Sequence, residues 1–127
     1  MDTTGGLMKE ELEQQLERMA QVVALTSDGQ VTLLRSVAST EDFIVTCLVA
    51  QNLAHRLGKT QKQTMSVDDL IGAGGLAQRI ARQTIYNSTS SLSKSKIIRK
   101  QGNEFYVDER TVLQFFAAKL PQLLKSA

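Results

Sequence analysis

The sequence is poor in the side chains that most often carry chemistry, with one cysteine, Cys47, one histidine, His55, and no tryptophan. A single cysteine allows no disulfide within the chain, which favours a reducing, cytoplasmic location. Cys47 and His55 fall in one predicted helix, where their eight-residue separation corresponds to about 12 Å along the axis. They are therefore too far apart to act as nucleophile and base. We expect no enzymatic activity, no metal site and no cofactor.

Long apolar runs are also missing. The longest strongly apolar stretch, Phe43 to Ala50, is interrupted by Thr46 and is far shorter than a membrane-spanning helix. Met1 to Leu7 is small and polar and does not resemble a signal peptide. We expect a cytoplasmic protein without a membrane partner.

The run Gly72-Ala73-Gly74-Gly75-Leu76-Ala77 matches the outline of a dinucleotide-binding fingerprint. It follows a predicted helix instead of a strand, and no acidic residue lies about 20 residues later. We interpret it as a turn that ends a helix.

Acidic residues are absent from a long internal stretch. Between Asp69 and Glu104 there is no carboxylate, yet six cations occur there: Arg79, Arg82, Lys94, Lys96, Arg99 and Lys100. The net charge of +2 hides an asymmetry, because residues 1–58 hold 4 basic and 8 acidic side chains and residues 59–127 hold 11 and 5. A basic surface of this kind favours a polyanionic partner. The alternative is a solvated face without a partner.

The residue patterns predict one domain, mainly α with a small β component (α+β). Asp28-Gly29 between two apolar runs is a strong hairpin signal, and Ser66-Val67-Asp68-Asp69 forms a capping box before a short helix. The first expected elements are a helix over 9–22 that stops near Gln21 and a hairpin of 22–25 and 31–34. Three helices follow: one over 41–57 that begins after Ser39 or Thr40, one from 66 to 75, and one from Leu76 or Ala81 to about Ser95. The last elements are a hairpin over 97–107 with a turn at 101–103 and a helix over 109–124 that Pro121 bends or ends. Within the single domain 1–127, we expect an N-terminal extension in 1–38, a core in 39–108 and a C-terminal helix in 109–127.

The predicted helix ending near Ser95 has two distinct faces. With Ile85 at the centre of the buried side and about 100° per residue, three residues lie within about 40° of it: Ala81, Thr89 and Leu92. The opposite side carries amides, hydroxyls and a lysine, with no carboxylate: Gln83, Asn87, Ser90 and Lys94, flanked by Tyr86 and Ser91. Such side chains donate to and accept from base edges and phosphates.

The segment from Ser66 to Val107 resembles the winged helix-turn-helix domains of bacterial and archaeal transcription regulators. The resemblance rests on Gln83 to Leu92 as the recognition helix, on Lys94 to Ile98 at its end, and on Arg99 to Val107 as the wing. It covers about a third of the chain, or about two thirds if the helix over 41–57 is the first of the trihelical core. It implies a recognition helix in the DNA major groove and a wing on the backbone or minor groove. The implied contacts are Gln83, Thr84, Tyr86, Asn87, Ser90 and Lys94 from the helix, and Arg99, Lys100 and Gln101 from the wing.

We therefore expect a protein that binds double-stranded DNA sequence-specifically and regulates transcription. Asn87 and Gln83 are the expected base readers, favouring adenine when their contact is bidentate, and the six cations of the acid-free stretch are expected to neutralise phosphates. Two alternatives stay open. A winged helix can also dock a partner protein without binding DNA. A component of replication, partition or mobile-element machinery would use the same DNA contacts.

Apolar stripes at both ends of the chain exceed what a minimal winged helix needs. The N-terminal stripe is Leu12, Leu16, Met19 and Val23, and the C-terminal stripe is Val112, Leu113, Phe116, Leu120, Leu123 and Leu124. We expect a homodimer through the terminal helices, which would place two recognition helices about 34 Å apart.

Overall fold

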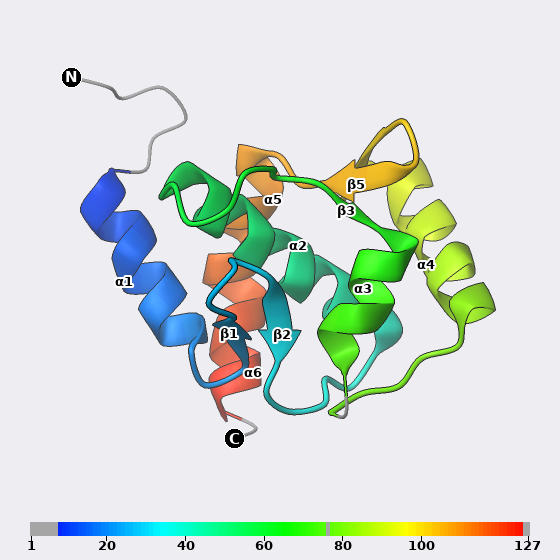
Figure 1. Ribbon diagram of the computed structural model, residues 1–127, viewed down its shortest axis with the longest axis horizontal. Helices are drawn as coiled ribbons and strands as arrows, with labels where there is room; N and C mark the ends of the chain where they lie inside the picture. Colours follow the sequence, from blue (N-terminus) through cyan, green and yellow to red (C-terminus); the bar gives the residue numbers. More distant parts are fainter. Residues whose placement is uncertain (1–7, 76, 126–127) are drawn as a thin grey trace.

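The computed structural model describes residues 8–75 and 77–125. It is mainly helical with two small antiparallel sheets, which confirms the predicted α+β class. The long helix α2 (Thr40–Arg56) runs through the middle, with α1 (Lys9–Met19) and α4 (Arg82–Lys94) at opposite ends of the molecule (Figure 1). Among the helices of the described residues, none has the length and apolarity needed to cross a membrane.

Helix α2 is the centre of the core because apolar side chains occupy all of its faces. The twelve residues from Phe43 to Ala54 are all buried. Of the two predicted cap residues, Ser39 and Thr40, the structure has Ser39, whose Oγ accepts a hydrogen bond from the Asp42 amide at 3.0 Å. The helix ends just before Gly58, whose φ of +75° is easily reached only by glycine.

The N-terminal hairpin pairs β1 (Val23–Leu25) with β2 (Val31–Leu33) around the predicted Asp28-Gly29 turn. Gly29 has a φ of +84°, and a Cβ built on it would lie 2.4 Å from the carbonyl oxygen of Lys59. Both the turn and its close approach to the chain after α2 therefore require glycine.

The second sheet has the strand order β3-β5-β4, with β3 (Met65–Ser66), β4 (Arg99–Gln101) and β5 (Glu104–Tyr106). The predicted C-terminal hairpin is present, but its first strand begins two residues later than expected, at Arg99. Its turn is limited to Gly102 and Asn103, because Gln101 pairs with Glu104. Strand β3 was not predicted, and it aligns Met65 opposite Phe105.

Helix α3 (Val67–Gly74) begins directly after β3 with the predicted capping box. The Ser66 Oγ accepts from the Asp69 amide at 3.0 Å, and Asp69 Oδ2 accepts from the Ser66 amide at 3.0 Å. The glycine run ends the helix, with Gly75 at a φ of +53°.

The C-terminal helix is continuous but contains a π-helical turn. It consists of α5 (Glu109–Gln114), η1 (Phe115–Lys119) and α6 (Leu120–Lys125). The Leu120 amide bonds the Phe115 carbonyl, five residues earlier. A proline ring clashes with the carbonyl four residues before it in a regular α-helix, and this wider turn lies just ahead of Pro121. The helix therefore passes through Pro121 instead of ending there.

Most of both terminal stripes is buried inside one copy of the chain. The buried members are Leu12, Met19 and Val23 at one end and Val112, Phe116 and Leu120 at the other. Helix α1 ends at Met19 instead of reaching Val22, because the Val22 amide bonds the Met19 carbonyl at 2.8 Å in the turn before β1. Leu113 differs from the others and is 44% exposed. Most of both stripes is therefore covered within one copy of the chain, and Leu113 is the member that stays exposed.

Candidate nucleic-acid interface

Helix α4 packs on the core through the face that the sequence predicts. Ile85 is 0% exposed, Thr89 2% and Leu92 3%. The predicted outward set is fully on the surface: Gln83, Asn87, Ser90 and Lys94 are all exposed, together with Thr84 and Tyr86. Ala81 was predicted to be buried and is exposed, because it is the N-cap residue and lies outside the helix.

The chain before α4 is a linker and not an earlier start of the helix. Leu76 lies outside the described residues, and residues 77–81 are not helical. Gln78 fixes this linker to the chain after β2 by donating to the Val37 carbonyl at 3.0 Å and accepting from the Val37 amide at 2.6 Å. Helix α4 then begins after Ala81 with no side-chain cap.

A groove of about 560 Å³ lies between the start of α3, helix α4 and the β4–β5 hairpin. Five of the predicted site residues line it: Arg82, Tyr86, Ser90, Lys94 and Lys100. Ser66, Ser93 and Asn103 add hydroxyl and amide groups that sequence reasoning did not assign to the site. We call this the α4 groove. Asp68 also lines the groove and pairs with Arg82, so Lys94 and Lys100 are the cations in it that suit a phosphate.

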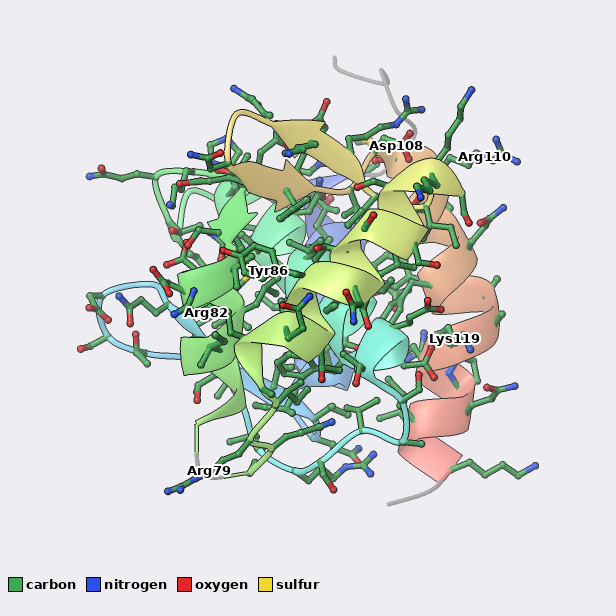
Figure 2. The ribbon with its side chains drawn as sticks, turned by 90° about the vertical axis from the view of Figure 1, so that its right-hand side faces the viewer. Arg79, Arg82, Tyr86, Asp108, Arg110 and Lys119 are labelled. Atoms are coloured by element: carbon green, nitrogen blue, oxygen red, sulfur yellow. The ribbon has the colours of Figure 1, made fainter. Side chains whose placement is uncertain are left out.

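The remaining predicted residues lie around this groove or away from it. Gln83 and Asn87 do not line it and form their own pair, in which Gln83 Nε2 donates to Asn87 Oδ1 at 3.0 Å. Lys96, Arg99 and Gln101 are exposed after the end of α4 and along β4. Arg79 lies apart, on the linker just before the start of α4 and far from the hairpin (Figure 2).

Two of the six cations are paired with acidic side chains that flank the acid-free stretch. Arg82 contacts Asp68 at 2.5 Å, and Arg99 contacts Asp108 at 3.2 Å. Burial of Asp108 opposes its ionisation, but its hydrogen bonds with the Thr111 amide and Arg99 outweigh that effect and lower its pKa. Arg79, Lys94, Lys96 and Lys100 have no carboxylate partner among the described residues.

Lys96 occupies a strained position at the end of α4. Its φ is +62°, a left-handed conformation that glycine usually takes. The Lys96 amide bonds the Ser93 carbonyl at 3.1 Å, and the Ile97 amide bonds the Leu92 carbonyl at 3.0 Å. This is the Schellman arrangement, and it turns the chain from α4 into the hairpin. A lysine thus stands at a position whose backbone conformation favours glycine.

Arg110 belongs to the same side of the molecule, although sequence reasoning missed it. The start of α5 is held beside the end of α4, because the Thr111 hydroxyl donates to the Ile97 carbonyl at 2.7 Å. Figure 2 shows Arg110 beside this end of α4. In the sequence Arg110 follows two acidic residues, whose charge would balance its own. In the structure both acids pair with other cations, Asp108 with Arg99 and Glu109 with Arg56. Arg110 is exposed and has no ion pair among the described residues.

Cys47 and His55, the candidate nucleophile and base of the sequence, do not form a catalytic site. Cys47 is fully buried in α2, and burial raises the pKa of its thiol far above the usual range. His55 is exposed, with Nδ1 3.4 Å from the Thr60 carbonyl oxygen. Across the part of the chain that the structure describes, no three His, Cys, Asp or Glu side chains gather as metal ligands.

Comparison with protein-family models, curated proteins and solved structures found no match. The functional interpretation therefore rests on the geometry of α4, the hairpin and the groove between them.

Proposed function

We propose that this protein is a winged helix-turn-helix protein that binds double-stranded DNA and regulates transcription. The element order supports this fold: α2, α3 and α4 form three consecutive helices, and the β4–β5 hairpin follows at once. Strand β3 between α2 and α3 joins the hairpin into one sheet. The hairpin is thereby fixed next to α4, as a wing next to a recognition helix must be.

The observation that carries the proposal is the outer face of α4. This helix contains no acidic residue, and its exposed side presents amides, hydroxyls and Lys94 over more than two turns. A surface helix that served only solubility would commonly carry both signs of charge. Gln83 and Asn87 are the residue types that read adenine through its N6 and N7 atoms. We assign them as base readers and the α4 groove as a site for backbone phosphate.

The decisive experiment measures fluorescence anisotropy with random DNA of about 30 base pairs, from about 50 to about 250 mM salt. We expect the logarithm of the binding constant to fall with the logarithm of salt with a slope of several units. The double variant Arg99→Ala, Lys100→Ala removes two wing cations and lowers this slope by about two. Lys9→Ala, Lys59→Ala is the matched control, because it removes the same charge from the opposite end of the molecule. Absence of binding at the lowest salt concentration refutes the proposal.

A second candidate is a protein-interaction module with the same fold. It is favoured by the pairing of Arg82 with Asp68 and of Arg99 with Asp108, which neutralises two of the six cations. In this case the Arg99 and Lys100 substitutions leave DNA affinity unchanged because there is none to lose. DNA binding of the expected kind also suits replication, partition or mobile-element machinery, and transcription assays with an identified target separate these roles.

A homodimer through the terminal helices is part of the proposal, although most of each terminal stripe is buried within one copy. A twofold dimer would still place two α4 helices on successive major grooves. Light scattering at micromolar concentration decides the point, since a mass near 14.0 kDa means a monomer.

A further inference from the structure

A second groove lies near the end of the molecule opposite α4. It is open, has a volume of about 1030 Å³ and lies between α1, the β1–β2 hairpin and the chain that follows α2 (Figure 1). None of the residues assigned to the DNA interface lines it. We call it the α1 groove. A partner held there would leave α4 and the β4–β5 hairpin free.

The apolar surface of the α1 groove comes from leucines that the core covers only in part. Leu16 of α1, Leu25 of β1 and Leu57 after α2 line the groove, and each is partly buried. Ala20 and Ala24 also line it, and their small side chains leave room above the leucines. Three separate segments therefore present aliphatic side chains to one occupant.

One wall of the groove is acidic. Glu10, Glu13 and Glu17 of α1 line it, and their spacing of three and four residues places them on one side of the helix. All three are exposed, and none forms an ion pair among the described residues. Lys59 is the single cation among the described residues that line the groove. An occupant with positive charge spread over about 10 Å matches this wall.

The groove offers an occupant side chains but no strand edge. Strand β1 pairs with β2, and Val23 at its start is 2% exposed, so the backbone there is covered. An extended peptide could not add a strand to this sheet. A helix satisfies its own amides and carbonyls internally and presents a stripe of apolar side chains at every third or fourth residue. The occupant that fits the groove is therefore helical.

We propose that the α1 groove binds a basic amphipathic helix of a partner protein. Aliphatic side chains on one stripe of that helix contact Leu16, Leu25 and Leu57, and lysines or arginines beside the stripe face the three glutamates of α1. Helix α4 of a second copy does not meet these requirements. It is basic, but its aliphatic residues Ile85 and Leu92 are both buried.

The probe for this site is a fluorescein-labelled peptide of about 18 residues, long enough to form a helix of several turns. It consists of leucine, lysine and alanine, with leucines at every third or fourth residue and lysines beside them. We expect the full-length protein to bind it at low salt, with shifts of the Leu16, Leu25 and Leu57 methyl signals in ¹H–¹³C spectra. Absence of binding, or unmoved signals for all three leucines, overturns the proposal.

Variants of the protein test the acidic wall and the floor separately. Glu13→Gln and Glu17→Gln should each weaken peptide binding about threefold at low salt. The matched control Glu41→Gln neutralises an exposed glutamate on α2 and should leave binding unchanged. Ala20→Arg places a cation in the groove, and we expect a loss of about tenfold or more. Ala38→Arg adds the same charge at an exposed position before α2, and equal affinities of these two arginine variants overturn the proposal.

Two altered peptides separate helix docking from simple charge attraction. A peptide with glutamate in place of every lysine should not bind. A peptide with one central alanine changed to proline keeps its charge and its leucines but cannot form a continuous helix, so we expect a loss of about tenfold or more. Equal binding of the proline peptide overturns the proposal. Light scattering tests a second copy as the occupant, since a dimer that the original peptide dissociates would also overturn it.

Discussion

Gln83 donates its side-chain amide to Asn87 across one turn of α4, at 3.0 Å between Nε2 and Oδ1. Both side chains are exposed, so the pair holds two amide groups in a fixed relation on the outer face. The Asn87 amide nitrogen and the Gln83 carbonyl oxygen are not used in this bond. They are the donor and acceptor that would be available to a base edge under the proposed function.

We expect Asn87→Ala to weaken binding to the preferred DNA sequence by about 1–3 kcal/mol and binding to random DNA very little, since a lost base contact affects only the matching base. Lys100→Ala should weaken binding to both DNAs alike, because phosphates are present in both. Anisotropy titrations on the two DNAs measure the difference. Equal losses from both variants on both DNAs remove the base-reading assignment.

Two substitutions of Lys96 separate the effect of its charge on DNA binding from the effect of its backbone strain on stability. Lys96→Gly should raise the free energy of unfolding by about 1 kcal/mol, because glycine adopts the φ of +62° without the steric cost. Lys96→Ala keeps the strain and should change stability by less than about 0.5 kcal/mol. Both lose the same charge, so both should lower the salt slope of DNA binding by about one. Urea unfolding and anisotropy give the two readouts, and a glycine variant no more stable than the alanine variant would contradict the strain.

Glu104 should make stability depend on acid pH. Hydrogen bonds from the Thr64 hydroxyl and from Lys62 lower its pKa below the ordinary value of about 4.3. A carboxyl group with a lowered pKa stabilises the fold above its unfolded pKa, and this contribution is lost as pH falls through the folded value. Glu104→Gln should therefore be less stable than the native protein at neutral pH, with the difference shrinking below about pH 4.3. Urea unfolding at a series of pH values measures it, and a pH-independent difference contradicts the assignment.

Two neighbouring residues of α4 should have opposite roles. Ile85 is 0% exposed, and Ile85→Ala should cost about 2–5 kcal/mol of stability through the cavity it leaves. Tyr86 is 48% exposed and lines the α4 groove, so Tyr86→Ala should change stability by less than about 0.5 kcal/mol while weakening DNA binding. Thermal unfolding and anisotropy on both variants test this division. Unchanged DNA affinity in the Tyr86 variant would place the ring outside the interface.

Arg110 extends the proposed interface beyond the acid-free stretch. We expect Arg110→Ala to lower the salt slope of DNA binding by about one, as loss of one phosphate contact does. Lys125→Ala is the control, since it removes an exposed cation from the last helix. Equal slopes for the two variants would exclude Arg110 from the contact surface.

Local signals in the sequence were sufficient to predict most helices and strands of this fold. The caps at Ser39 and Ser66 and the Asp28-Gly29 turn are determined by near neighbours, and each was found where it was predicted. The outward face of α4 also followed from helical periodicity alone. Strand β3 could not be predicted in this way, because its two residues are too few to show an alternation of apolar and polar side chains, and Ser66 also serves as a helix cap.

The misses share one cause, which is packing between distant parts of the chain. The sequence of the π-helical turn at Phe115–Lys119 predicts ordinary helix, and Pro121 alone predicts a bend or an end. Arg110 was concealed for the same reason, since the partners of Asp108 and Glu109 come from other segments.

The placement of α1 and α4 at opposite ends gives the molecule an electric dipole moment. The α1 side carries Glu10, Glu13 and Glu17, which are exposed and have no ion pair among the described residues, and the α4 side carries the exposed lysines and arginines. Near any polyanion such a molecule experiences a torque that turns α4 forward before contact, which raises the fraction of productive encounters. The same torque keeps α1 on the side away from the polyanion.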